Sequence, residues 1–211
     1  MTPQHDLPGA PDHDVVPGAP AAAPGVGAGA HDPRWPVRPA HPQDVPDILA
    51  MVRELAEYER SAHEVLATEE SMADLLFGSN TPSGSPADYC HVISNPDPQD
   101  GSGALAGIAL WFLNTSTWTG RHGIYLEDLY VRPAFRGRGF GRDLMAALAS
   151  FCVERGYTRL EWSVLDWNTP ALDFYRTLGA RGMDEWTVHR VTGIDLTRLA
   201  DSHRGQSSTR Q

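Results

Sequence analysis

Residues 131–142 combine two residue types that together bind anionic groups. The stretch reads V-R-P-A-F-R-G-R-G-F-G-R and is expected to join a strand to a helix. Its glycines allow backbone amides to approach an oxyanion closely at the helix start. Arg136, Arg138 and Arg142 add fixed positive charge around those amides in an otherwise acidic chain. Residues 136–142, which we call the cradle, are therefore predicted to hold a pyrophosphate group.

Other phosphate-binding motifs fit this stretch less well. The stretch does not match the dinucleotide-binding fingerprint G-x-G-x-x-G, because its glycines are spaced G-x-G-x-G. The acidic residue that this fingerprint expects about twenty residues further on is nevertheless present as Glu161. That fingerprint also belongs at the first strand of a βαβ unit, whereas three strands are expected before the cradle. A Walker loop requires a lysine, and the sequence contains none. A glycine-rich helix start with solvated arginines remains the simplest alternative.

A second stretch, residues 166–180, reads D-W-N-T-P-A-L-D-F-Y-R-T-L-G-A. Asn168 is a favoured helix N-cap residue. Helical spacing brings Asn168, Ala171, Leu172 and Tyr175 onto neighbouring turns of one side of the helix. This arrangement allows Tyr175 to point toward the end of a ligand held by the cradle, with packing in the core as the alternative.

The composition of the chain narrows the class of ligand and partner. Its 211 residues are enough for one well-buried core. A formal net charge of −10 disfavours nucleic-acid binding and suits a small cationic substrate. No stretch has the ~20 uninterrupted apolar residues that span a membrane, so no membrane association is expected. Cys90 and Cys152 fall in an expected strand and helix, which indicates reduced thiols and a cytoplasmic location.

The apolar periodicity predicts one α+β domain, with a mixed, mainly antiparallel sheet flanked by helices. Residues 1–33 form a Pro-, Ala- and Gly-rich stretch that predicts a disordered tail, residues 34–200 the domain, and residues 201–211 a flexible end. The expected strands are 35–39, 89–93, 104–113, 123–131, 159–165 and 185–191, and the expected helices are 42–60, 68–78, 139–155 and 168–178.

Both motifs resemble signatures of the GNAT superfamily of N-acetyltransferases. The cradle carries Arg136-Gly-Arg-Gly139-Phe-Gly141 where the family has Arg/Gln-x-x-Gly-x-Gly/Ala, and residues 168–179 resemble its N-x-x-A-x-x-F-Y-x-x-x-G motif. The resemblance covers residues 35–192 and implies the GNAT fold, with acetyl-CoA as cosubstrate. It implies that acetyl-CoA is held by Leu129, Tyr130, Val131, Arg136, Gly137, Arg138, Gly139, Phe140, Gly141, Arg142, Asn168 and Ala171.

Acetyl transfer from a thioester to an amine requires a neutral amine and a proton for the departing thiolate. Deprotonating a lysine-like amine at pH 7 costs about 4.6 kcal/mol, so a carboxylate acting through water is useful. We expect Glu127 to be this base, Tyr175 to be the acid, and the Val131 amide to stabilise the oxyanion. In a regular strand Glu127 and Val131 share a face and Asp128 faces oppositely, but the family's strand has a bulge near this point.

Further stretches resemble one branch of the family, the diamine acetyltransferases with polyamine-type and thialysine-type members. They include Glu54-Leu-Ala-Glu-Tyr58-Glu59, Ser116-Thr-Trp118 and Val164-Leu-Asp-Trp167-Asn168. Ser116 replaces an acidic residue of the polyamine type, which favours a shorter amine or a lysine analogue. The resemblance implies a homodimer and a cation-binding set of acidic and aromatic residues, namely Tyr58, Glu59, Trp118, Asp128, Trp167, Glu185 and Trp186.

Some alternatives remain open at this point. The acceptor could be another amine, such as an antibiotic or a protein N-terminus, or the chain could be a non-catalytic acetyl-CoA sensor. The presence of both Glu127 and Tyr175 favours an enzyme over a sensor. The nine histidines show no tight metal-ligand spacing, so no metal is expected.

Overall fold

A computed structural model describes residues 37–79, 81, 84–96 and 103–207, so the predicted tail at residues 1–33 lies outside the described residues. The fold contains a five-stranded sheet in the order β1-β2-β3-β4-β5. Strands β1 to β4 pair antiparallel, and β5 pairs parallel to β4. The strands are β1 (Arg38–Pro39), β2 (Asp88–Ser94), β3 (Leu105–Ser116), β4 (Arg121–Val131) and β5 (Leu160–Trp162). The α+β fold class predicted from the sequence is confirmed.

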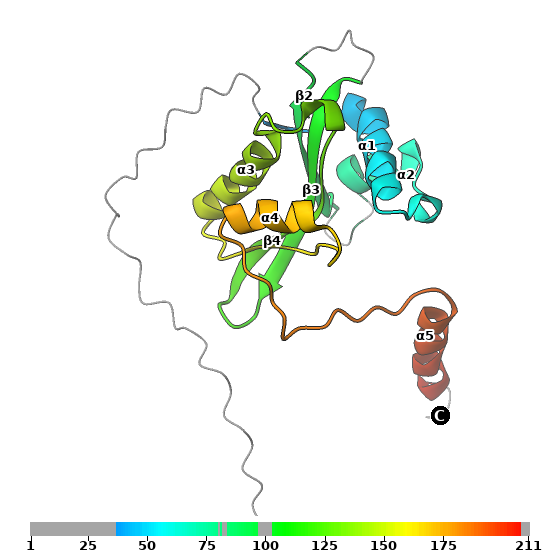
Figure 1. The fold of residues 1–211 in the computed structure, drawn as a ribbon. Coiled ribbons are helices and arrows are strands. Elements are labelled where there is room, and N and C mark those ends of the chain that lie inside the picture. The colour runs from blue at the N-terminus through cyan, green and yellow to red at the C-terminus, as the bar shows by residue number, and fades with distance from the viewer. Residues whose placement is uncertain (1–36, 80, 82–83, 97–102, 208–211) are drawn as a thin grey trace, which may run out of the picture. The chain divides into compact units, whose positions relative to one another are not determined.

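Helices cover both faces of this sheet. Figure 1 shows α1 (Val45–Tyr58) and α2 (Glu69–Phe77) on one side and α3 (Phe140–Arg155) on the other. Helix α4 (Thr169–Thr177) packs on the same side as α3, where Phe174 lies beside Gly141 of α3 and the Tyr175 ring contacts that of Trp162 in β5. Among the described residues, short 3-10 helices lie at Pro42–Asp44, Ala62–Glu64 and Pro133–Phe135.

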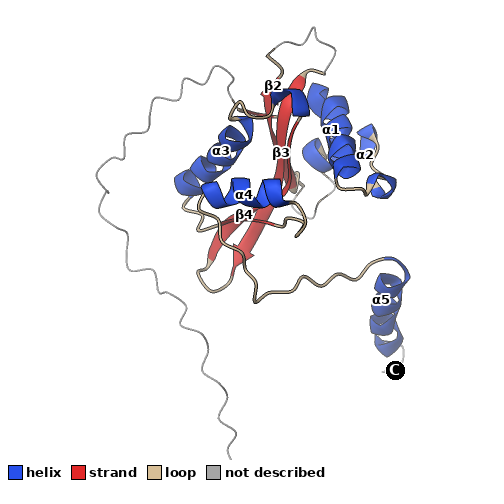
Figure 2. Ribbon diagram, in the orientation of Figure 1, coloured by secondary structure: helices blue, strands red, loops and turns tan. Residues whose placement is uncertain are grey.

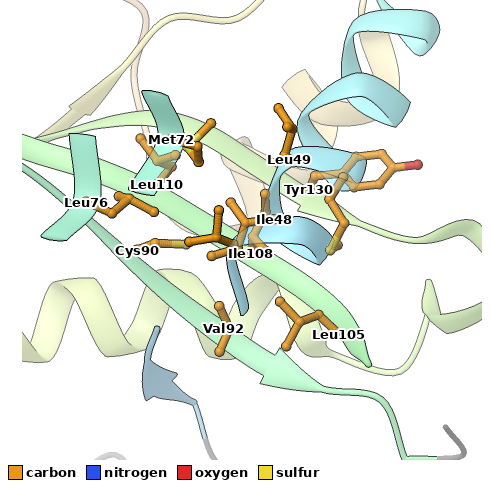
Figure 3. Close-up of a cluster of buried hydrophobic side chains, with 12 residues drawn as sticks. Ile48, Leu49, Met72, Leu76, Cys90, Val92, Leu105, Ile108, Leu110 and Tyr130 are labelled. Carbon is orange, nitrogen blue, oxygen red and sulfur yellow. The ribbon is translucent and has the colours of Figure 1, made fainter. Parts of the chain in front are cut away.

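The sheet separates two apolar clusters. The cluster on the α1 side joins that helix and α2 to alternate residues of β2 and β3, and Figure 3 shows most of its members. The cluster on the α3 side contains Trp111, Leu126, Phe140 and Leu144, all of them buried. Burial of apolar side chains at ~25 cal/mol per Å² is the main stabilising contribution on both faces.

A β-bulge at Glu127 changes which face each residue of β4 occupies. Leu110 of β3 pairs with Asp128, but the next residue, Trp111, pairs with Leu126, so Glu127 has no partner. Leu126 therefore belongs to the α3-side cluster, whereas Tyr130 belongs to the α1-side cluster. The face assignment expected for a regular strand is wrong here, because one extra residue inverts the alternation.

The sequence located most elements to within a few residues, including the start of α2. The Thr68 hydroxyl oxygen accepts a hydrogen bond from the Ser71 amide, and the Thr68 amide donates one to the Ser71 hydroxyl oxygen, as a capping box requires. The first expected helix begins at Val45, because Pro42–Asp44 is a 3-10 turn.

The largest differences from the sequence expectations follow α4. Residues 185–191 form no strand, although one was predicted, and β5 spans three residues where seven were expected. Helix α5 (Gly193–Ser207) occupies residues for which no element was predicted. Figure 2 shows the stretch between α4 and α5 as loop.

Candidate active site

A cavity of about 820 Å³ opens where β4, β5, α1 and α4 meet the cradle. The residues of the cradle that line it are Arg136, Gly137, Gly139, Phe140, Gly141 and Arg142. The rest of the wall consists of Leu55, Tyr58, Glu59, Leu126, Glu127, Asp128, Leu129, Tyr130, Val131, Phe135, Trp162, Ser163, Val164, Leu165, Asn168, Pro170, Ala171, Phe174 and Tyr175. Residues as far apart in the sequence as Leu55 and Tyr175 thus meet around one space.

The backbone of the cradle has a conformation that requires glycine. Gly137 has φ of +75° and Gly139 has φ of +91°, and a Cβ added at either position would meet nothing within 4 Å. Glycine is therefore required by the dihedral angle rather than by crowding. The two glycines therefore border open space directly before the N-terminus of α3, and a helix N-terminus beside open space fits an anionic group such as pyrophosphate.

Exposed arginines surround this loop. The Arg136 guanidinium lies 5.6 Å from the ring centroids of Tyr58 and Tyr130, and its Nε donates to the Val131 carbonyl at 2.9 Å. Arg142 donates to the Thr177 hydroxyl at 3.2 Å. Arg138 lies over Phe135 and is absent from the cavity wall, in contrast to the sequence expectation for it. Cationic side chains therefore flank the amides, as phosphate recognition requires.

Three carboxyl groups gather at the opposite end of the cavity. Glu59 follows α1, while Glu127 and Asp128 come from the bulge of β4. Burial, with smaller effects of Glu127 and Glu59, raises the pKa of Asp128 to about 6. Burial also raises the pKa of Glu59. An ammonium group placed here would relieve the repulsion among these carboxylates.

Tyr175 lies on the wall of the same cavity, close enough to Glu59 for that carboxylate to act on its phenol. Its ring centroid is 4.7 Å from that of Trp162 and 5.3 Å from that of Phe174. Burial and the charge of Glu59 raise the pKa of the phenol to about 12, so the hydroxyl keeps its proton throughout the neutral range. No residue of the described chain forms a hydrogen bond with this hydroxyl.

A hydrogen bond connects α1 to α4 across 110 positions of sequence. The Tyr58 hydroxyl donates to Asn168 Oδ1 at 3.0 Å, and the same oxygen accepts from the Ala171 amide at 3.3 Å. Asn168 is thus both the N-cap of α4, as predicted, and the anchor of Tyr58. Arg60, the residue after Glu59, has φ of +63° and lies 5.5 Å from the Trp167 ring. This turn directs the chain away from α1 directly after Glu59.

Some residues expected in the substrate site do not line the cavity. Trp118 lies in the turn between β3 and β4 and is 71% exposed, and Trp186 is 66% exposed beside the exposed Glu185. Trp167 also lies outside the wall, but its ring is 5.9 Å from that of Tyr58.

Arg132, a buried arginine directly after β4, was not among the functional residues predicted from the sequence. Arg132 donates to Asp47 at 2.7 Å, to Glu54 at 3.1 Å and to the Leu105 carbonyl at 2.8 Å. These bonds connect β4 to α1 and to the start of β3. No local sequence signal identifies Arg132, because its partners lie 27 to 85 positions away.

The described part of the chain contains no group of three or more His, Cys, Asp or Glu residues able to hold a metal ion. Among the described helices none is long and apolar enough to cross a membrane.

Comparisons with known proteins agree with this geometry. Residues 51–180 match the model of the acetyltransferase (GNAT) family. A thialysine N-epsilon-acetyltransferase of Sus scrofa is 39% identical over 78% of this chain and 96% of its own. An L-ornithine N5-acetyltransferase of Arabidopsis thaliana is 32% identical over 77% of this chain and 86% of its own.

The solved structures show the same fold at lower identity. An integron cassette protein of V. cholerae superimposes with a TM-score of 0.62 at 23% identity, over 79% of this chain and 97% of its own. A soil metagenomic aminoglycoside acetyltransferase gives a TM-score of 0.58 at 19% identity, over 77% and 97% of the two chains. The matched residues include both halves of the cavity wall, and the chain belongs to the GNAT family of acetyltransferases.

Proposed function

We propose that this enzyme transfers the acetyl group of acetyl-CoA to a primary amine of a small cationic substrate of the thialysine, ornithine or diamine type. The observation that carries the proposal is the meeting of three features around one cavity. These are a cationic, glycine-rich loop, a protonated phenol and a group of three carboxyls, of which Glu59 and Asp128 are half-buried. Each feature alone occurs in many proteins, whereas the reaction needs all three around one cavity.

Acetyl-CoA, which family membership implies, supplies an acetyl thioester whose carbonyl carbon accepts the amine. The open space before the cradle amides and the exposed Arg136 and Arg142 fit its pyrophosphate. Leu129, Tyr130 and Val131 lead from the cradle toward Tyr175 and line the path of the pantetheine arm. In this proposal the Val131 amide donates to the carbonyl oxygen as negative charge develops on it.

Glu127 accepts the proton of the incoming ammonium group through water. Its position at the bulge gives it a place on the cavity wall without a cross-strand neighbour. Asp128 and Glu59 attract the ammonium, and its positive charge favours the ionised form of Asp128. Because Asp128 has a pKa of about 6, amine binding should strengthen as pH rises through that value.

Tyr175 donates a hydrogen bond to the leaving sulfur. Full transfer from a phenol of pKa about 12 to a thiolate of pKa ~8.5 is uphill by about 5 kcal/mol. The phenol therefore stabilises the developing thiolate mainly as a donor, and proton transfer is completed as the amine loses its proton. Its fixed ring contacts with Trp162 and Phe174 keep the hydroxyl oriented.

The acceptor class rests on the acidic end of the cavity and on the relatives. Relatives named for thialysine and for ornithine both act on amines that carry an amino-acid head group. Glu59, Glu127 and Asp128 suit such an ammonium, and Ser116 disfavours a long polyamine. We also propose that the enzyme works as a homodimer in the cytoplasm, where its free cysteines, Cys90 and Cys152, stay reduced.

An amine panel tests this function. Purified enzyme with acetyl-CoA is mixed with thialysine, ornithine, lysine, spermidine, an aminoglycoside or a peptide N-terminus, and released CoA thiol is measured. We expect kcat/KM for thialysine or ornithine to exceed that for spermidine by at least ~10-fold, about 1.4 kcal/mol of discrimination. Acetyl-CoA binding without thiol release for any amine would instead identify a sensor.

The base is tested in the same assay with Glu127→Gln. Loss of the carboxylate should lower kcat/KM most strongly at pH 7, where the amine is charged, and least at pH 9.5. Glu154→Gln, on the exposed part of α3, is the matched control and should leave the pH profile unchanged. An equal loss at every pH would argue against Glu127 as the base.

A further inference from the structure

The proposed amino-acid acceptors bring a negative charge to an acidic part of the cavity. Thialysine and ornithine carry a carboxylate besides the amine that reacts. The carboxyls of Glu59, Glu127 and Asp128 attract the ammonium group but repel that carboxylate. Among the described residues, the cationic ones on the cavity wall are Arg136 and Arg142, both in the cradle, where the pyrophosphate is proposed to bind. The carboxylate of the acceptor therefore needs a different cation beside the cavity.

Arg60 lies in the turn that directly follows Glu59 and has an unusual backbone conformation. Among the described residues it is the only one other than glycine with a positive φ, +63°. Its amide donates to the Glu57 carbonyl at 3.1 Å, and the Ser61 amide donates to the Ala56 carbonyl at 2.8 Å. These two bonds form a common helix-ending motif in which the left-handed position is usually glycine. Arginine thus occupies a position where glycine would have a lower free energy, and such strain is concentrated at functional sites.

The Arg60 side chain stacks on an aromatic pair beside the cavity. Its guanidinium carbon lies 5.5 Å from the centroid of the Trp167 ring, and this ring lies 5.9 Å from that of Tyr58 on the cavity wall. Stacking uses the face of the guanidinium and leaves its N–H edge available to a planar acceptor. Arg60 and Trp167 are both exposed, so a substrate entering the cavity can reach them.

The charge of Arg60 has no anionic partner within the part of the chain that the structure describes. By contrast, Arg38, Arg132 and Arg159 each pair with a carboxylate. An exposed, unpaired arginine is by itself common on protein surfaces. Arg60 differs because it follows a cavity-wall carboxylate directly and is stacked beside the same wall. Its N–H edge is therefore available to an anion at the cavity.

We propose that Arg60 binds the carboxylate of an amino-acid acceptor and so selects ornithine- and thialysine-type substrates over diamines. The reacting amine lies near Glu127, and the other end of the same molecule extends past Tyr58 to the guanidinium. There two N–H groups donate to the two carboxylate oxygens. Glu59 and Arg60 thus place opposite charges one residue apart, as an amino-acid substrate does at its two ends. This assignment rests on the proposed function, because it concerns the acceptor of that reaction.

Substrates that differ only in the carboxylate test the assignment. Ornithine and putrescine form one such pair, and lysine and cadaverine form another. Arg60→Gln should lower kcat/KM for ornithine by ~10-fold, because the charge-assisted hydrogen bonds are lost. For putrescine kcat/KM should stay the same or rise by up to ~3-fold, because its second ammonium no longer faces a cation.

Arg155→Gln is the matched control for this measurement. Arg155 is likewise an exposed arginine stacked on a ring, 4.9 Å from the centroid of Phe151, but it lies outside the cavity wall. Its substitution should change kcat/KM for neither amine. An equal loss of the preference for ornithine in Arg155→Gln would mean that the net charge of the enzyme, rather than Arg60, selects the substrate, and would overturn the assignment.

Arg60→Gly separates binding of the carboxylate from a structural role. Glycine fits the left-handed turn, so this variant should keep or raise the Tm in thermal melts. It should nevertheless lose the preference for ornithine over putrescine as fully as Arg60→Gln does. If the two Arg60 variants lowered kcat/KM for both amines by the same factor, Arg60 would serve only to place Glu59 and the assignment would be wrong. An unchanged ratio between the amines would overturn it as well.

A binding measurement keeps this inference separate from the proposed function. Calorimetric titration of the CoA-saturated enzyme with ornithine or putrescine measures the acceptor site without turnover. Ornithine should bind ~10-fold more weakly to Arg60→Gln than to wild type at low salt, and the difference should shrink at high salt. If wild type acetylates neither amine but binds ornithine in this Arg60-dependent way, the proposed function fails and the role of Arg60 stands. If wild type acetylates both amines equally well and Arg60→Gln does the same, acetyl transfer stands and the role of Arg60 is refuted.

Discussion

The cradle end of the active-site cavity comes from one continuous stretch of chain, whereas the carboxylate end is assembled from α1, β4 and α4. The cradle binds through backbone geometry, with Gly137 and Gly139 in the left-handed region. The carboxylate end binds through side chains whose positions depend on a bulge and on long-range hydrogen bonds. A local loop can thus specify the acetyl donor, while tertiary packing specifies the amine that accepts the acetyl group.

The two ends also differ in how they treat charge. The arginines of the cradle are exposed, so water and rings of neighbouring side chains stabilise them before any ligand binds. The carboxyls are partly desolvated next to one another, which raises the pKa values of Asp128 and Glu59. The acceptor end therefore holds unfavourable electrostatic energy that a cation can relieve. Substitutions should separate these behaviours.

Removal of the Tyr175 hydroxyl should give the largest effect, because in the proposed mechanism this group contacts the leaving sulfur directly. For Tyr175→Phe we expect kcat to fall by ~10²–10³-fold, since the donor to the leaving sulfur is lost. The KM for acetyl-CoA should change by less than about 2-fold, because the hydroxyl contributes to the transition state rather than to binding. Tyr157→Phe, outside the cavity wall, is the control in steady-state assays. If Tyr175→Phe raised KM and left kcat unchanged, Tyr175 would take no part in the chemical step.

A substitution in the cradle should affect the donor end alone. Gly139→Ala places a Cβ at φ of +91°, which costs about 2 kcal/mol or shifts the loop, and the KM for acetyl-CoA should rise ~30-fold. The KM for the amine at saturating acetyl-CoA should stay near its original value. Gly120→Ala, at φ of +62° in the turn between β3 and β4, carries similar strain away from the cavity. If both variants raised the KM equally, global destabilisation and not the cradle would be responsible.

The same contrast explains what could be predicted from the sequence. The cradle, the N-cap role of Asn168 and the position of Tyr175 on a cavity wall depend on residues close together in sequence, so motif spacing was sufficient. The bulge at Glu127 depends on how β4 aligns with β3, which alternation alone does not reveal. Arg132 has no local signature, because its bonds with Asp47 and Glu54 exist only in the folded chain.

The C-terminal part shows a different limit. The alternation at residues 185–191 and the β-prone residues 163–165 predicted strands, yet a strand also requires a neighbour to pair with. Helix α5 has weak apolar periodicity and a polar C-terminal end, so no helix was predicted there. The local residue pattern shows that a segment can form a strand, whereas contacts with a neighbouring strand decide whether it does.

Neutralising Asp128 should have the smallest effect of the three substitutions. It should stabilise the fold but weaken binding of the amine. Asp128 has a pKa of about 6 in the folded protein against 3.8 in its ordinary state, so its ionised form destabilises the fold. Above pH 6, Asp128→Asn should therefore raise the free energy of unfolding by about 1–2 kcal/mol and the Tm by roughly 3–6 °C. The gain should shrink as pH falls from 6 to 4 and vanish below 4, where wild type is protonated as well.

The same Asp128→Asn protein should bind the amine more weakly at pH 7.5, because the ammonium loses an ionised partner, while the KM for acetyl-CoA stays unchanged. Thermal melts at pH 4, 6 and 8, together with amine KM values, measure both effects. Asp184→Asn, an exposed carboxylate outside the cavity, is the control and should change neither. A stability gain that is independent of pH would mean that packing, not charge, sets the environment of Asp128. If the stability gain of Asp128→Asn follows the ionisation of Asp128, the ionised carboxylate that binds the cation also destabilises the folded protein.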